Sequence, residues 1–149
     1  NLPILRKDFI LDPWQVLESR SVGADCILII LAAVNDKTAN ELIKVSKNLN
    51  MDSLVEAHDE KELDRAIKLD PDLIGINNRN LNTLSVDIET TIKLSRKVPK
   101  KYDIVCESGI ETNADLNRVL KFGVERFLVG ESLMKNDDIT KATKILLGA

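Results

Sequence analysis

The fold is decided by Cys26-Ile27-Leu28-Ile29-Ile30-Leu31, an apolar run with no polar residue inside it. A strand with one face in water alternates apolar and polar residues, so an unbroken run indicates a strand that is covered on both faces, as in a parallel sheet. Similar short runs recur at residues 3–9, 53–57, 73–77, 104–108 and 127–130. The sequence therefore predicts six strands in a parallel sheet.

Between these runs lie segments with helical spacing and recognisable ends. Asp12-Pro13 supplies an N-cap and a proline at the first helical position, and Gly23 supplies the stop. The later helices are predicted to begin at Asp36, Asp59, Asp87, Thr112 and Asp138. Residues 59–62 and 112–115 resemble capping boxes, and the helix that starts at Asp87 has to end before Pro99.

Six consecutive βα units with right-handed crossovers fit two architectures. An open doubly wound sheet accommodates 149 residues, whereas a closed (β/α)8 barrel needs eight units and about 250 residues. Length alone favours the open sheet. The placement of polar residues favours the barrel, and no linker divides the chain. We therefore expect residues 1–149 to form a single domain, an incomplete TIM barrel of six βα units.

The composition excludes several classes of protein and partner. Apolar residues make up 44% of the chain, charged residues make up 30%, and the net charge is −3, which excludes a disordered chain and a basic nucleic-acid-binding protein. The longest apolar run, residues 26–34, is too short to cross a bilayer. The opening residues 1–4 lack the charged region and cleavage site of a signal peptide. Because Cys26 and Cys106 both lie in apolar runs, we expect no disulfide framework and a cytoplasmic location, without membrane or nucleic-acid partners.

Polar residues or glycines stand at the ends of five of the six predicted strands. They are Lys7 and Asp8, Glu56, Asn77 to Arg79, Glu107 to Gly109, and Gly130 to Ser132. Any one of these groups can be explained as a helix cap or an exposed turn. Because ligands of βα proteins bind at the carboxyl ends of the strands, the five together favour a shared pocket there.

Lys7 and Glu56 are the candidate acid and base. Alternation puts Lys7 on one face with Leu5 and Phe9, where it either reaches out to solvent or acts as an acid in a pocket. Glu56 can act as a base if its partner is a lysine, because burial and a nearby charge tune both groups; otherwise it forms a salt bridge or caps the next helix. His58, the single histidine, is expected at the surface or in support of the site, and no residues have the spacing of a metal site.

Gly109 and Gly130 are the candidate phosphate-binding residues. Each follows one of the last two strands and precedes a helix, so its backbone N–H can approach an anion near a helix N-terminus. Barrels often bind phosphate between the loops after their last two strands. The alternative is that each glycine only shapes a tight turn, and the charge of Glu131 has to point away from a phosphate.

Six blocks in the same order and at similar spacing closely resemble indole-3-glycerol-phosphate synthase, a lyase of tryptophan biosynthesis that is built on a (β/α)8 barrel. The blocks are PILRKDFI at residues 3–10, GAD at 23–25, LVEAH at 54–58, IGINNRNL at 74–81, ESGI at 107–110 and VGESLM at 129–134. The resemblance implies that the chain holds strands three to eight of the barrel and is part of a longer chain, without the first two βα units.

The resemblance implies ring closure, decarboxylation and dehydration of 1-(2-carboxyphenylamino)-1-deoxyribulose 5-phosphate to indole-3-glycerol phosphate, with no cofactor or metal. In that reaction Lys7 is the general acid and Glu56 the general base. The resemblance implies that Asn77 orients these two groups and that Arg79 supports the polar end of the substrate. Glu107 and Ser108 are implied to contact the sugar chain or to hold the acid and base. Backbone N–H groups of Gly109, Gly130 and Glu131 are implied to bind the phosphate, and the aromatic ring is implied to lie against Phe9, Leu28, Leu81 and Leu128.

Two alternatives remain open. The first is another phosphate-binding barrel enzyme, such as phosphoribosylanthranilate isomerase or a ribulose-phosphate epimerase, which the pairing of Lys7 with Glu56 disfavours. The second is a catalytically inactive fragment that associates with itself or with the missing amino-terminal segment, because six βα units leave two strand edges unpaired.

Overall fold

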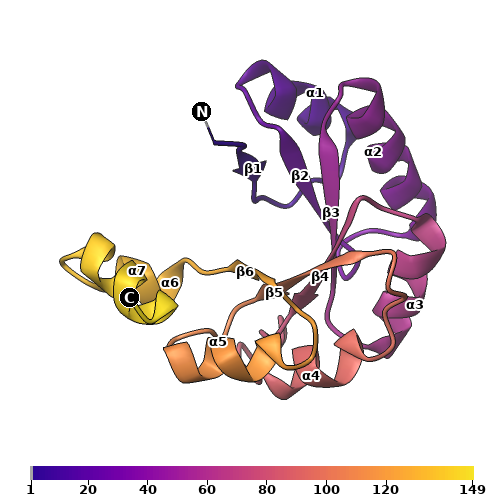
Figure 1. Ribbon diagram of the computed structural model, residues 1–149. Coiled ribbons are helices and arrows are strands. Elements are labelled where there is room, and N and C mark those ends of the chain that lie inside the picture. Colours follow the sequence, from indigo (N-terminus) through magenta and orange to yellow (C-terminus); the bar gives the residue numbers. More distant parts are fainter. Residues whose placement is uncertain (1) are drawn as a thin grey trace. The chain divides into compact units, whose positions relative to one another are not determined.

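The computed structural model describes residues 2–149, and its strands follow one another across the sheet in the order of the sequence (Figure 1). The strands are β1 (Leu5–Arg6), β2 (Cys26–Ile30), β3 (Asp52–Ala57), β4 (Leu73–Asn77), β5 (Asp103–Glu107) and β6 (Arg126–Leu128). A doubly wound sheet reverses its strand order at a switch point, whereas consecutive units of a barrel keep the order of the chain. The predicted incomplete (β/α)8 barrel is therefore confirmed, and the open doubly wound alternative is wrong.

The helices begin close to the predicted caps. They are α1 (Pro13–Ser21), α2 (Asp36–Asn48), α3 (Glu60–Leu69), α4 (Glu89–Ser95), α5 (Asn113–Leu120), α6 (Glu131–Met134) and α7 (Ile139–Leu147). Asp12, Thr112 and Asp138 accept hydrogen bonds from the backbone N–H groups of the first turns that they precede. The helix expected from Asp87 begins two residues later, at Glu89, whose N–H donates to the Asp87 carboxylate as in a helix cap.

The capping box expected at residues 59–62 is only half formed. Asp59 accepts a hydrogen bond from the Glu62 N–H at 2.8 Å, as a cap should. The Glu62 carboxylate, however, accepts from the backbone N–H of His58, one residue before the expected donor. This difference ties the first turn of α3 to the histidine.

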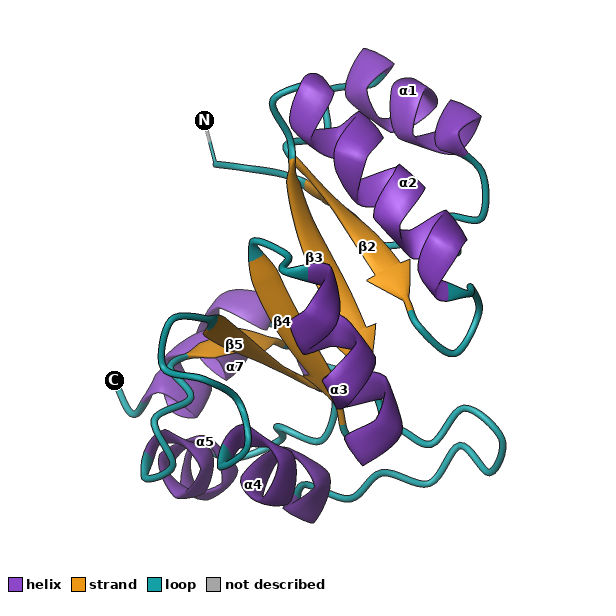
Figure 2. Ribbon diagram, turned by 90° about the vertical axis from the view of Figure 1, so that its right-hand side faces the viewer, coloured by secondary structure: helices purple, strands orange, loops and turns teal. Residues whose placement is uncertain are grey.

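The chain divides into two compact units, Asn1–Gly75 and Ile76–Ala149. In the first unit β2 and β3 are parallel, with Leu28 opposite Leu54 and Ile30 opposite Glu56. Figure 2 shows α1 and α2 on one side of these strands. Ile29 and Val55 pack into the core with residues of the helices, so the alternate residues of the strands face the other way. Glu56 therefore lies on the face that the helices do not cover.

The second unit repeats this arrangement with β5 and β6. Cys106 lies opposite Phe127 and packs in a core cluster with Val119 and Leu146, which come from α5 and α7. Glu107, the next residue, lies opposite Leu128 and is 1% exposed. By alternation it lies on the face away from that cluster. Each unit thus carries a buried glutamate near the carboxyl end of a strand, on the face away from its helices.

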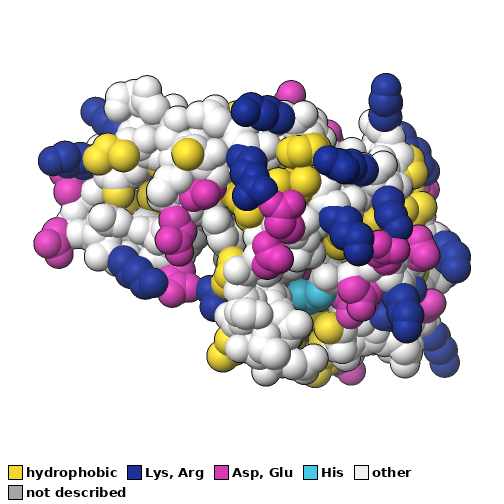
Figure 3. All heavy atoms as spheres, turned by 90° about the horizontal axis from the view of Figure 1, so that it is seen from below, with side chains coloured by type: hydrophobic (Ala, Val, Ile, Leu, Met, Phe, Trp, Pro, Cys, Tyr) yellow, Lys and Arg dark blue, Asp and Glu magenta, His cyan; other side chains and the backbone are white. Residues whose placement is uncertain are grey.

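The surface carries charges of both signs. Figure 3 shows Lys and Arg side chains interspersed with Asp and Glu on the face that it draws. Within residues 2–149, no helix has the length and apolar character needed to cross a membrane.

Candidate functional site

Lys7 and Glu56 come together in the first unit. Lys7 directly follows β1, and its Nζ lies 3.9 Å from Oε2 of Glu56 on β3. The Lys7 side chain is half-exposed at 49%, whereas the Glu56 side chain is 0% exposed. Glu56 does not cap α3, because Asp59 is the cap. The pair thus brings a proton donor and a carboxylate base to one place, which is the arrangement that acid–base catalysis needs.

His58 is the contact of Glu56 that the sequence analysis did not predict. Its Nε2 lies 3.1 Å from Glu56 Oε1, and its Nδ1 lies 2.9 Å from Glu62 Oε2. Burial alone lowers the pKa of His58, but hydrogen bonds and charges from Glu56 and Glu62 raise that pKa to about 9. The side chain is 13% exposed, and the histidine atoms (cyan) reach the surface in Figure 3. His58 is therefore half-buried, with part of its ring at the surface and both ring nitrogens beside carboxylates.

Asn77 and Asn78 shape the loop after β4. Asn77 is buried, and its Oδ1 accepts a hydrogen bond from the Arg79 N–H at 3.0 Å. The backbone N–H of Asn78 donates to the Glu107 carbonyl, and its Nδ2 donates to the Ser108 carbonyl, each at 2.9 Å. Asn78, which was not among the predicted site residues, therefore connects this loop to the end of β5.

Ser108 and Gly109 turn the chain after β5 with positive φ angles of 63° and 79°. A serine in this left-handed region is strained, and such strain concentrates at functional loops. A Cβ on Gly109 would lie 2.9 Å from Cγ1 of Val86, so this position needs glycine for its space as well as for its φ angle.

Arg79 and Glu131 form an ion pair in the second unit, although 52 positions separate them. Arg79 Nη2 lies 2.6 Å from Glu131 Oε2, and Lys135 Nζ lies 2.8 Å from Glu131 Oε1. The hydrogen bond and charge of Lys135, followed by those of Arg79, hold the pKa of Glu131 below its usual value. Gly130 is the N-cap residue of the short helix α6. The charge of Glu131 is thus matched by two cations, which removes the objection raised by a carboxylate next to a phosphate site.

The predicted ring wall falls in both units. Phe9 is 55% exposed and Leu28 is 1% exposed in the first unit. Leu81 is 38% exposed in the second unit, and Leu128 is half-buried on β6. Leu28 lies opposite Leu54 on the face of the strands that carries Glu56, so it can only form the floor of a site there.

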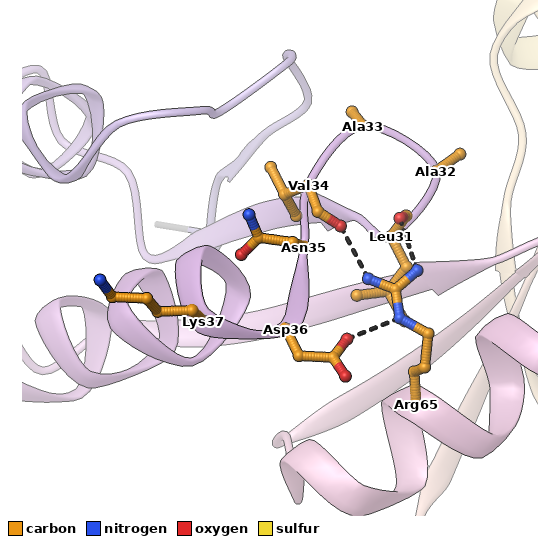
Figure 4. A pocket seen from close by; sticks show the side chains of 8 residues that line it. All are labelled: Leu31, Ala32, Ala33, Val34, Asn35, Asp36, Lys37 and Arg65. Carbon is orange, nitrogen blue, oxygen red and sulfur yellow. Dashed lines mark hydrogen bonds and ion pairs between the residues drawn. The ribbon is translucent and has the colours of Figure 1, made fainter.

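The loop after β2, which carries no predicted site residue, borders an open pocket. Arg65 on α3 donates to the carbonyls of Leu31 and Val34 and to Asp36 Oδ1, at 2.9, 2.7 and 2.6 Å (Figure 4). The pocket is lined by residues 31–37 and by Arg65 itself. Because the guanidinium is bonded to three parts of one loop, its role is to fix that loop. Among residues 2–149, no three His, Cys, Asp or Glu side chains are grouped to hold a metal ion.

Comparison with known proteins gives one consistent family. A family model described as "Indole-3-glycerol phosphate synthase" matches residues 1–146. The chain is similar to the indole-3-glycerol phosphate synthase of Azospirillum brasilense, at 52% identity over 147 residues, covering 99% of this chain and 56% of the relative. It is similar to the protein of the same name from Rhodospirillum rubrum, at 47% identity with the same coverage. The chain thus spans about half the length of the curated relatives that it matches.

Solved structures share the fold at low identity. One is 3-hexulose-6-phosphate synthase from Salmonella typhimurium, with a TM-score of 0.79, 16% identity, and coverage of 98% of this chain and 74% of that one. Another is a mandelate oxidase mutant, with a TM-score of 0.74, 14% identity, and coverage of 97% of this chain and 55% of that one. At this identity the similarity concerns the architecture alone.

Proposed function

The chain belongs to the indole-3-glycerol phosphate synthase family, and from that membership we propose that the natural protein which carries it is a carboxy-lyase of tryptophan biosynthesis. It converts 1-(2-carboxyphenylamino)-1-deoxyribulose 5-phosphate to indole-3-glycerol phosphate, carbon dioxide and water. The observation that carries this proposal is the approach of a half-exposed ammonium to a fully buried carboxylate, Lys7 Nζ to Glu56 Oε2, at 3.9 Å.

Lys7 supplies the proton for ring closure. As the aromatic carbon attacks the ketone carbon of the substrate, negative charge grows on the ketone oxygen, and the Lys7 ammonium donates a proton to it. Carbon dioxide then leaves from the ring carbon, and its bonding electron pair remains in the new ring. The ion pair with Glu56 holds the ammonium on the correct face of the sheet until the substrate displaces it.

Glu56 removes the proton that dehydration requires. The hydroxyl formed in ring closure leaves as water, while a neighbouring proton is taken by a base so that the indole double bond forms. A carboxylate is a competent base when it is ionised and shielded from water, and Glu56 is buried with cationic neighbours that favour its charged form. None of these three reaction steps calls for a cofactor.

The second unit supplies the residues for the phosphorylated chain of the substrate. Backbone N–H groups of Gly109, Gly130 and Glu131 bind the phosphate, since glycine lets an anion approach the backbone closely. Arg79 binds the polar end of the substrate and exchanges its contact with Glu131 for one with the ligand. The remaining proposed contacts are orientation by Asn77, sugar contacts from Glu107 and Ser108, and ring contacts from Phe9, Leu28, Leu81 and Leu128.

The proposal is tested by the products that the full natural chain forms from the carboxyphenylamino substrate. We expect equal amounts of carbon dioxide and indole-3-glycerol phosphate, in the absence of added metal or cofactor. Turnover of phosphoribosylanthranilate instead would replace the proposal with the isomerase alternative. Turnover by the full natural chain but not by the 149-residue chain would identify these 149 residues as an inactive fragment, and the oligomeric state of that fragment in solution would then be measured. The expected cytoplasmic location is tested separately, by fractionating cells that produce the full natural chain and measuring in which fraction it is found.

A further inference from the structure

His58 lies in the turn between β3 and α3, and its ring is held at both nitrogens. Nε2 lies 3.1 Å from Glu56 Oε1, and Nδ1 lies 2.9 Å from Glu62 Oε2. The Glu62 carboxylate also accepts a hydrogen bond from the backbone N–H of His58, at 2.8 Å. A carboxylate therefore lies beside each nitrogen of the ring, and the one at Nδ1 is hydrogen-bonded to it.

The two contacts together identify the protonation state of the ring. An ionised carboxylate only accepts hydrogen bonds, and neutral imidazole carries a hydrogen on one nitrogen alone. A neutral ring would set a nitrogen lone pair against one of the two carboxylates. Only the imidazolium places an N–H and a positive charge beside both Glu56 and Glu62, and the pKa of His58, which those two residues raise to about 9, agrees with this geometry.

The two oxygens of Glu56 have different neighbours. Oε1 faces the His58 ring at 3.1 Å, whereas Oε2 lies 3.9 Å from Lys7 Nζ. Both contacts are ion pairs, and the contact with His58 is the shorter one. Oε1 is thus paired with the histidine of the turn between β3 and α3, and Oε2 is the oxygen on the side of the half-exposed Lys7.

Glu62 anchors the histidine to a helix. Its backbone N–H donates to the Asp59 cap at 2.8 Å, so it stands in the first turn of α3. The charged groups that face the ring from the adjoining elements are Glu56 on β3 and Glu62 on α3, with Lys7 beyond Glu56. The chain Glu62–His58–Glu56 therefore links a rigid helix to the proposed base.

We propose that His58 is a positioning residue, which as an imidazolium held by Glu62 binds Oε1 of Glu56 and so presents Oε2 for proton transfer. This inference rests on the proposed function, in which Glu56 is the base. It adds to that function a second cation, opposite Lys7, that keeps the base ionised and oriented.

The pairing is tested directly by NMR titration of the histidine ring in the full natural chain, with the signal assigned by its loss in His58→Gln. We expect a pKa of about 9 in the unaltered protein. Glu62→Gln removes one anionic partner and should lower that pKa toward about 6.5, the value of a free histidine. The matched control is Asp59→Asn, which removes a negative charge from the same helical turn, retains a capping side chain, and should leave the ring near 9. A ring that titrates near 6.5 in the unaltered protein, or that ignores Glu62→Gln, overturns the proposal.

The effect on catalysis is tested with two substitutions of the histidine. His58→Leu removes the cation beside Glu56, and we expect kcat to fall about 10- to 100-fold, as for partners that orient a reacting group, with KM changed less than threefold. His58→Gln keeps an N–H donor without the charge and should recover part of the loss. In both variants the acid limb of the kcat/KM profile should move to higher pH, because Glu56 loses a cation that favours its ionised form.

The results separate this inference from the proposed function. If the natural protein does not turn over the substrate, the proposed function fails, and the ring titration still decides the pairing of His58. If it turns over the substrate and folded His58 variants keep kcat within twofold and an unchanged pH profile, the positioning role is wrong while the function stands. If the His58 variants do not fold, kcat and the pH profile of Glu62→Gln decide the question, because that substitution acts on Glu56 only through the histidine.

Discussion

Replacing Asn78 by alanine should weaken the second unit more than its place in a loop suggests. Asn78 is 3% exposed. Its Oδ1 accepts from the backbone N–H and from Oγ1 of Thr91, at 2.9 and 2.8 Å, and its Nδ2 donates to the Ser108 carbonyl at 2.9 Å. In the variant the Thr91 hydroxyl keeps a contact with Sγ of Cys106 at 3.4 Å. The Thr91 N–H and the Ser108 carbonyl each lose a partner.

The expected loss of unfolding free energy follows from those two groups. A buried polar group left without a partner costs about 1–3 kcal/mol, and the half-buried Ser108 carbonyl is at the low end of that range, so Asn78→Ala should cost about 2–4 kcal/mol. Asn82→Ala, an exposed asparagine in the same loop, is the matched control and should stay within about 0.5 kcal/mol.

Urea denaturation followed by circular dichroism measures both variants, and hydrogen exchange of the Thr91 amide gives a local readout. We expect that amide to lose protection in Asn78→Ala and to keep it in Asn82→Ala. If the two variants lose the same free energy, or if the Thr91 amide remains as protected as in the unaltered protein, the contribution assigned to these hydrogen bonds is wrong.

Further predictions concern the loop after β5, the loop after β2 and the response to pH. Gly109→Ala should cost about 1–3 kcal/mol of unfolding free energy, because alanine is strained at a φ of 79° and its Cβ would lie 2.9 Å from Val86. Adding Val86→Ala should restore the part of the loss that comes from this contact. An unchanged unfolding free energy in Gly109→Ala would refute the prediction. Arg65→Met should cost about 1–3 kcal/mol and increase proteolysis of the loop that it fixes, whereas unchanged proteolysis would contradict that role. His58 has a folded pKa of about 9, above the value of about 6.5 in an unfolded chain, so its stabilisation is complete below pH 6.5 and is lost as the pH rises through 9. The difference in urea midpoint between the unaltered protein and His58→Gln should therefore shrink over that range, and a constant difference would argue against the charged ring.

The central strands could be predicted from the sequence because burial on both faces determines them. The predicted strands 26–31 and 73–77 match β2 and β4 to within one residue. The prediction of residues 3–9 failed at both ends, since β1 contains only Leu5 and Arg6. There the Asp8 carboxylate accepts a hydrogen bond from the Phe9 N–H at 2.8 Å, a local contact that competes with the ladder of the sheet.

The candidate site was predictable where a strand end carried its own signal, and not where the partner came from elsewhere. The sequence blocks single out Lys7 and Glu56. They do not reveal the contact of Arg79 with Glu131, because no local pattern links residues 52 positions apart. His58 had a signal, since Glu56 and His58 are two apart and His58 and Glu62 are four apart. That signal was missed because the pattern of residues 59–62 assigned Glu62 to a capping box with Asp59, and not to a contact with His58.

The acid–base role of Lys7 and Glu56 is tested most directly by the rate of indole-3-glycerol phosphate formation in the full natural chain after substitution of each residue. Lys7→Met and Glu56→Gln should each lower kcat by at least about 100-fold, which is the lower end of what a positioned acid or base contributes. Lys44→Met and Glu41→Gln, which change exposed residues of α2, should leave kcat within twofold. A folded Lys7→Met or Glu56→Gln protein that retains more than about one tenth of kcat would contradict the assignment.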